Sequence, residues 1–153
     1  MISAAALVFY LFLIIGIFVA MEGVAWLLHR YVMHGFGWYV HEDHHRYTKG
    51  RLEKNDLFGL SFSILSFLLI MLGFFSQVWI ALAAGIGIML YGVGYFLVHD
   101  IFFHRRIKIR YRPKSAYMKR VLHAHAMHHQ QSTEHDGVSF GFLYAGKQYA
   151  VKE

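Results

Sequence analysis

The sequence has no cysteine, and only one of its 153 residues is proline. Without thiolate ligands the chain cannot hold an iron–sulfur cluster, a thiolate-bound haem or a cysteine-based zinc finger. Any metal that it binds must therefore be held by nitrogen and oxygen atoms. The absence of cysteine gives no information about the redox compartment.

Positive charge is absent from two long stretches. No Lys or Arg precedes Arg30, and none lies between Leu57 and Phe103. The first stretch lacks the basic leader of a signal peptide, so we expect this segment to stay in the mature protein. Residues 4–28 form an apolar run broken only by Glu22. Because about 20 apolar residues suffice to cross a bilayer, this run predicts a first spanning helix.

The second uncharged stretch predicts two further spans, over about 57–75 and 78–101. The apolar run divides near Phe75-Ser76-Gln77, which leaves room only for a tight hairpin. Gly85 and Gly87 would make the third span slender enough for close helix packing. The composition, 57% hydrophobic and 18% aromatic, is also not that of a soluble domain. We expect an all-α integral membrane protein, a single domain over 1–153, with about three transmembrane helices.

The distribution of charge predicts the orientation. All fifteen Lys and Arg residues lie in 30–54 or 105–152, after the first and third spans. Three spans place these two stretches on the same side of the membrane, and the positive-inside rule assigns that side to the cytoplasm. The sequence therefore predicts a multi-pass protein of the inner (cytoplasmic) membrane. The His-rich regions 29–56 and 99–153, with their helices and the C-terminus, would face the cytoplasm.

Histidine is abundant, and ten of the twelve histidines form two matching sets. Each set reads HxxxxH followed by HxxHH. A lone histidine near a membrane is usually an interfacial or hydrogen-bonding residue, but this repetition favours a cage for more than one metal ion, since imidazole suits Fe, Cu, Zn and Ni. His123 and His135 fit neither set. The ten candidate ligands are His29, His34, His41, His44, His45, His99, His104, His125, His128 and His129.

The spacing within each set predicts local structure. Positions i, i+3 and i+4 of HxxHH share one helix face, so each motif predicts a comb of three ligands. We expect one comb on a short helix over about 39–47 and the other on a helix over roughly 114–130. The HxxxxH spacing turns about 140° on a regular α-helix, so these pairs can meet only at a π-bulge or a helix end.

Carboxylates lie near the histidines. Metal-bound imidazoles usually donate their second N–H to a carboxylate or carbonyl, so Asp56 and Asp100 are candidate outer partners. Glu22 is an ionisable group inside a span and is a candidate functional residue for that reason. Two interpretations of Glu22 stay open: it points along the helix toward His29, or it forms hydrogen bonds within the bundle.

The motifs together resemble a known family. The string HRYVMHGFGWYVHEDHHRYTKGRLEKNDLFGL, with YFLVHDIFFHRR, AHAMHH and GVSFGFLYA, is similar to the bacterial β-carotene hydroxylases of the membrane-bound fatty acid hydroxylase superfamily. The resemblance runs from about His29 to Tyr144. It implies a non-haem di-iron monooxygenase that uses O₂ to hydroxylate the β-ionone rings of β-carotene at C3 and C3′, giving β-cryptoxanthin and then zeaxanthin.

The resemblance also implies cofactors and partners. The ten histidines would hold two iron ions, although zinc can take such sites in preparations. Electrons would come from ferredoxin, with NAD(P)H upstream. The carotenoid would enter from the bilayer through a channel lined by aromatic side chains. Ordinary helix packing or lipid contact is the alternative role for each of these side chains. The candidate side chains are Trp26, Phe58, Phe62, Tyr91 and Tyr95.

The segment 105–120 carries eight positive charges and no negative one. Contact with anionic lipid headgroups and docking of an acidic ferredoxin both remain open. Nucleic-acid binding is not expected, because the segment abuts a span. The alternation over 106–112 suggests an interfacial strand.

Other functions remain open. A related member of the superfamily could be a sterol or fatty acyl hydroxylase or desaturase, or a carotenoid ketolase. The alternative that is not an enzyme is a bis-imidazole haem protein or a metal carrier. Haem would require paired ligands inside the bilayer, whereas these histidines cluster at one face.

Overall fold

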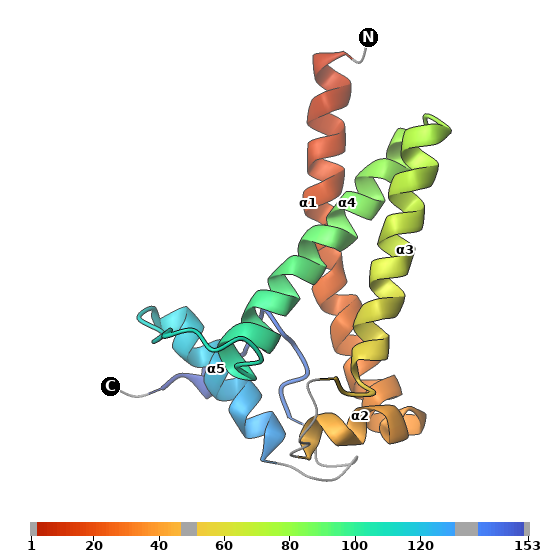
Figure 1. The fold of residues 1–153 in the computed structure, drawn as a ribbon. Helices are drawn as coiled ribbons and strands as arrows, with labels where there is room; N and C mark the ends of the chain where they lie inside the picture. The colour runs from red at the N-terminus through yellow and green to blue at the C-terminus, as the bar shows by residue number, and fades with distance from the viewer. Residues whose placement is uncertain (1–2, 47–51, 131–137, 152–153) are drawn as a thin grey trace. The chain divides into compact units, whose positions relative to one another are not determined.

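The computed structural model describes residues 3–46, 52–130 and 138–151, and within these ranges the chain is helical with no strand (Figure 1). This confirms the all-α prediction. The elements in chain order are α1 (Ala4–Leu27), η1 (Leu28–Phe36), α2 (Trp38–His45), α3 (Asp56–Phe75), α4 (Trp79–Tyr95), η2 (Phe96–Phe103), α5 (Ala116–His129) and η3 (Lys147–Tyr149).

Three segments of the described chain are long and apolar enough to cross a membrane. They are Ala4–Phe36, Asp56–Phe75 and Trp79–Phe103, which agree with the predicted spans. α3 and α4 are joined by three residues, of which Gln77 has a positive φ of 57°. The predicted tight hairpin is therefore present. These features are those of an integral membrane protein.

The chain divides into two compact units, Met1–Met21 with Phe58–Val93, and Glu22–Leu57 with Gly94–Glu153. In the first unit small residues allow close helix contact, as predicted for Gly85 and Gly87. A Cβ atom on Gly73 would lie 2.4 Å from the backbone nitrogen of Leu82, and one on Gly87 would lie 3.0 Å from the Ile14 carbonyl oxygen. The buried Ser66 hydroxyl donates to the Gly85 carbonyl at 2.8 Å, a hydrogen bond of the kind that joins neighbouring helices in membrane proteins.

The second unit contains all ten histidines of the two sets. One HxxxxH pair lies within the π-helical segment η1, and the other begins in η2 at His99 and ends at His104, the residue directly after η2. The sequence predicted a π-bulge or a helix end for such pairs. The backbone N–H of His104 donates to the His99 carbonyl, five residues back, at 2.9 Å. Such a bond closes a wider turn than that of an α-helix. η1 also contains a kink at His34 and Gly35, where φ and ψ leave the helical region.

The two short helices carrying HxxHH are also present. α2 begins after Gly37, where a Cβ atom would lie only 2.8 Å from the Val32 carbonyl oxygen. α5 begins after Ser115, whose hydroxyl accepts the backbone N–H of Met118 at 3.2 Å as an N-cap. The predicted strand over 106–112 was wrong. These residues are irregular, because no other strand in the described ranges offers a partner for their backbone.

Candidate metal centre

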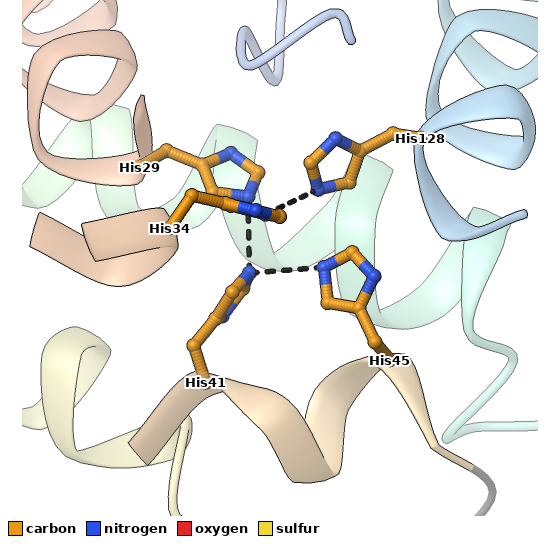
Figure 2. A group of neighbouring side chains, drawn as sticks. All are labelled: His29, His34, His41, His45 and His128. Carbon is orange, nitrogen blue, oxygen red and sulfur yellow. Dashed lines mark hydrogen bonds between the residues drawn. The ribbon is translucent and has the colours of Figure 1, made fainter. Parts of the chain in front are cut away.

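The ten histidines form two groups of five, and the candidate ligand atoms in each group all lie within 4.8 Å of one another. Seven of the ten side chains are buried. Figure 2 shows the first group, with rings from η1, α2 and α5 directed toward a common centre. Group A consists of His29, His34, His41, His45 and His128; group B consists of His44, His99, His104, His125 and His129.

Each group draws on both sequence sets. His44 of the first HxxHH motif belongs to group B, and His128 of the second belongs to group A. The expectation that the three histidines of each comb aim at one place was therefore wrong. On an α-helix, positions i+3 and i+4 lie 100° apart, so one helix packed between two groups can contribute to both.

The outward-facing nitrogens fix the orientation of five rings. Each Nδ1 lies within hydrogen-bond distance of an oxygen that can only accept, so Nδ1 carries the proton and donates. Nε2 of these rings is then left with its lone pair. The donors and their acceptors are His29 to the Phe140 carbonyl (3.0 Å), His41 to Asn55 Oδ1 (2.7 Å), His44 to Glu53 Oε2 (2.8 Å), His99 to Asp100 Oδ1 (2.9 Å) and His128 to the Val138 carbonyl (2.8 Å).

The inward-facing nitrogens are the atoms that could hold metal. Nε2 of His29 lies 3.1 Å from Nε2 of His41, and Nε2 of His44 lies 2.9 Å from Nε2 of His99. In both pairs each ring carries its proton on Nδ1, so the two Nε2 lone pairs face each other and repel. A cation bound between the two Nε2 atoms would attract both lone pairs. Imidazole nitrogens bind zinc at about 2.0–2.1 Å, which separates opposite ligands by about 4.2 Å, so the donor set fits a metal of this size in each group.

The outer partners of the two groups differ in charge. In group B, Arg106 donates to Glu53 Oε2 and to Asp56 Oδ1, each at 2.7 Å, and its Nε lies 3.6 Å from Asp100 Oδ1. Glu53 and Asp100 in turn accept from the two group B histidines His44 and His99. In group A the corresponding acceptors of His29, His41 and His128 are two backbone carbonyls and a neutral amide.

Comparison with known proteins agrees with this geometry. The fatty acid hydroxylase family matches residues 14–146, most of the chain. The chain belongs to the fatty acid hydroxylase family. It is 46% identical to the β-carotene hydroxylase of Pantoea ananas over 83% of this chain and 72% of that protein. It is 45% identical to that of Pseudescherichia vulneris (84% and 73%) and 39% identical to that of a Paracoccus species (87% and 82%). No solved structure matches.

The predicted outer partners of this fatty acid hydroxylase family member fall in three different places. Asp100 contacts a histidine directly, His99. Asp56 instead binds Arg106 and accepts the backbone N–H of Glu53 at 3.0 Å. The Glu22 carboxylate accepts three backbone N–H groups from the irregular segment 142–144, a partner that neither interpretation named.

Sequence reasoning missed three contributors to the hydroxylase centre. Glu53 and Asn55 each accept from a group histidine, and their only signal in the sequence is that they lie within three residues of Asp56, a predicted outer partner. The segment around Phe140 has no signal in the sequence other than its resemblance to the family. Backbone carbonyls carry no signal in the sequence, so their contacts with His29 and His128 could not have been found.

The aromatic channel candidates divide between the two units. Trp26 lines a pocket of about 910 Å³ that also includes His34 of group A. The ring of Tyr95 stacks on His99 with centroids 4.5 Å apart. Phe58, Phe62 and Tyr91 belong to the other unit, where Tyr91 packs edge-on against Phe18. Their assignment to a channel stays a prediction.

The two remaining histidines lie apart from the groups or outside the described residues. His123 is exposed, and its Nδ1 lies 3.0 Å from the Tyr149 carbonyl oxygen. His135 falls outside the described residues. His123 is therefore a suitable control position for substitutions of the group histidines.

We expect acid to destabilise the metal-free hydroxylase. Burial lowers the pKa of His41 to about 3 and that of His104 to about 4, from an ordinary 6.5. Below pH 6.5 the unfolded chain therefore binds protons that the folded chain does not, so stability is complete above this pH and falls as the pH drops toward 4. The thermal midpoint of the purified metal-free protein, measured from pH 8 to pH 4.5, should be flat at first and then decrease. A midpoint that rises on acidification would contradict the assignment of neutral buried histidines.

Proposed function

We propose that this chain hydroxylates the β-ionone rings of β-carotene at C3 and C3′, with O₂ as the oxygen source, to give β-cryptoxanthin and then zeaxanthin. The observation that supports this most strongly is the similarity to three bacterial β-carotene hydroxylases over more than four fifths of the chain. The convergence of ten histidines into two groups supports the same proposal.

The ten histidines would each bind one of two iron ions, five in group A and five in group B, and zinc could replace iron in preparations. Bound iron would supply the activation of O₂ that breaks a C–H bond, which acid–base groups cannot attack. The chain would work as one hydroxylase domain over 1–153. Its residues would hold the imidazoles neutral and aimed inward, since the outer acceptors fix the proton on Nδ1.

The pocket beside His34 would receive the ring that is hydroxylated. Aromatic side chains of Trp26, Tyr31 and Phe140 line it, and such apolar walls suit a hydrocarbon ring. The Arg30 guanidinium lies 5.2 Å from the Trp26 ring centroid and 5.4 Å from that of Tyr31, so its charge is held against these faces. A substrate insoluble in water would reach this pocket from the bilayer.

The remaining parts of the proposal concern electrons and orientation. The protein would lie in the inner membrane with both His-rich regions on the cytoplasmic side, as the charge distribution indicates. A ferredoxin reduced by NAD(P)H would supply electrons from that side. The exposed basic residues of 105–114, which follow His104 of group B directly, would serve either this acidic partner or anionic lipid.

Expression in cells that accumulate β-carotene tests the function. We expect β-cryptoxanthin at early times and zeaxanthin at late times, measured by chromatography against standards. The matched control is the His29→Ala variant, which should be present in the membrane without forming either product. A keto carotenoid, or unchanged β-carotene in cells that contain the folded wild-type protein, would contradict the proposal.

An absorption spectrum of the purified protein tests the metal. About two iron ions per chain without a Soret band would agree with the proposed centre, whereas a Soret band would indicate haem. Haem is disfavoured by the arrangement of the ligands, because each group offers five imidazoles within 4.8 Å rather than two on opposite sides of a ring.

A further inference from the structure

Glu22 holds three consecutive residues of a distant segment. Its Oε1 accepts the backbone N–H groups of Phe142 at 2.9 Å, Leu143 at 2.9 Å and Tyr144 at 2.8 Å. Charge-assisted bonds of this kind are about twice as strong as neutral ones. A carboxylate in an apolar segment is costly unless it is paired in this way. The contact therefore fixes the position of this segment against α1.

The held segment, residues 138–145, is here called the strap, and it supplies outer partners to group A. The Phe140 carbonyl accepts from His29 Nδ1 at 3.0 Å, and the Val138 carbonyl accepts from His128 Nδ1 at 2.8 Å. The Phe142 ring also stacks on the His29 ring, with centroids 5.0 Å apart and an interplanar angle of 8°. Two ligands of group A thus owe their orientation to the strap.

The strap has little freedom to move relative to Glu22. A Cβ atom on Gly141 would lie 2.8 Å from Glu22 Oε1 and 2.6 Å from the Tyr144 carbonyl oxygen. Ser139 has a φ of 56°, in the left-handed region that only a few non-glycine residues occupy. A glycine is required at 141 because no side chain fits between the carboxylate and the turn.

Group B takes its outer partners from other segments. His44 donates to Glu53 and His99 donates to Asp100, and neither acceptor belongs to the strap. Among the described residues, the strap meets group B through ring contacts of Phe142, whose centroid lies 5.4 Å from that of His99 and 6.3 Å from that of His125. Loss of the strap's position would therefore affect the two groups unequally.

We propose that Glu22 is a positioning residue for group A: by holding the strap, it keeps the Phe140 and Val138 carbonyls on His29 and His128, so that Nε2 of both rings points inward. This inference rests on the proposed function only in requiring two metal ions. Removal of an outer partner of a metal ligand typically lowers metal affinity 10–100-fold. The effect of losing Glu22 should fall in this range and should be confined to group A.

Cobalt binding tests the inference without measuring hydroxylation. The full-length protein, purified in detergent and freed of metal, is titrated with Co²⁺ alone, and the bound ions and their visible absorption are recorded. His29→Ala and His99→Ala serve as references for loss of group A and group B. Glu22→Ala should lose affinity for one ion about 10–100-fold and resemble the His29→Ala reference. Glu22→Gln, whose amide oxygen still accepts hydrogen bonds, should bind closer to the wild type.

Gly141→Ala provides a second variant that keeps the carboxylate. It should weaken the same ion, whereas Gly16→Ala, where a Cβ atom meets nothing within 4 Å, should bind like the wild type. Equal weakening of both ions in Glu22→Ala, wild-type binding in that variant, or Glu22→Gln no better than Glu22→Ala would overturn the inference. A wild-type protein that binds fewer than two Co²⁺ ions would instead overturn the proposed two-metal centre.

Discussion

The His128→Ala variant should lose the metal ion of group A and lower hydroxylation by more than about 100-fold, since even outer partners of metal ligands contribute 10–100-fold. The reason is geometric. His128 is fully buried, and its Nε2 lies 3.2 Å from that of His34 in the same group. Metal content of the purified variant and product formation in carotene-accumulating cells would measure the effect. His123→Ala, at an exposed position on the same helix, is the control and should change neither.

Variants of two neighbouring histidines on α5 test the assignment of the histidines to groups A and B. His125 lies one helical turn before His128 but belongs to group B, with its Nε2 3.3 Å from that of His104. The metal-binding spectra of His128→Ala should therefore match those of His41→Ala and differ from those of His125→Ala. If His125→Ala and His128→Ala lose the same ion, the division of each HxxHH motif between two groups is wrong.

Replacement of Arg106 by leucine should release the group B ion and lower stability by about 1.5–3 kcal/mol, the range for hydrogen bonds to charged groups. Without the guanidinium, Glu53, Asp56 and Asp100 would repel one another beside His44 and His99. Arg106→Lys should recover only part of the loss, because an ammonium group cannot reproduce the planar fork that reaches two carboxylates at 2.7 Å. Thermal unfolding and metal content report both effects.

The exposed Arg110 provides the control for this prediction. Arg110→Leu removes the same charge from the same basic segment without touching a carboxylate of the group B network. It should leave metal content and unfolding temperature unchanged. If Arg106→Leu keeps a wild-type group B ion, the carboxylates do not depend on Arg106 for their positions.

The spans and both short helices could be predicted because their signals are local. A charge-free apolar run fixes a span, and the five-residue spacing of His99 and His104 is compatible with a π-turn but not with a regular helix. These features depend on residues close together in the sequence. No knowledge of tertiary contacts was needed to find them.

The division into groups A and B could not be predicted, because it depends on where α2 and α5 lie relative to each other. The spacing of His41, His44 and His45 is compatible with three ligands for one ion or with ligands for two. The rings of His45 and His129 stack with centroids 4.6 Å apart, which shows how closely the two helices bring the groups together. This contact joins positions 84 residues apart, and no pattern within either motif encodes it.

The exchange of His44 and His128 between the groups also determines when each group becomes complete during synthesis. Neither group is complete until α5 has left the ribosome, although the first four ligands of group A are made by residue 45. At about 5–20 residues per second, the wait from His45 to His128 lasts on the order of 4–17 seconds. The last histidine of group A, His128, and the last of group B, His129, are adjacent in the sequence, so both groups become complete at almost the same moment, late in synthesis.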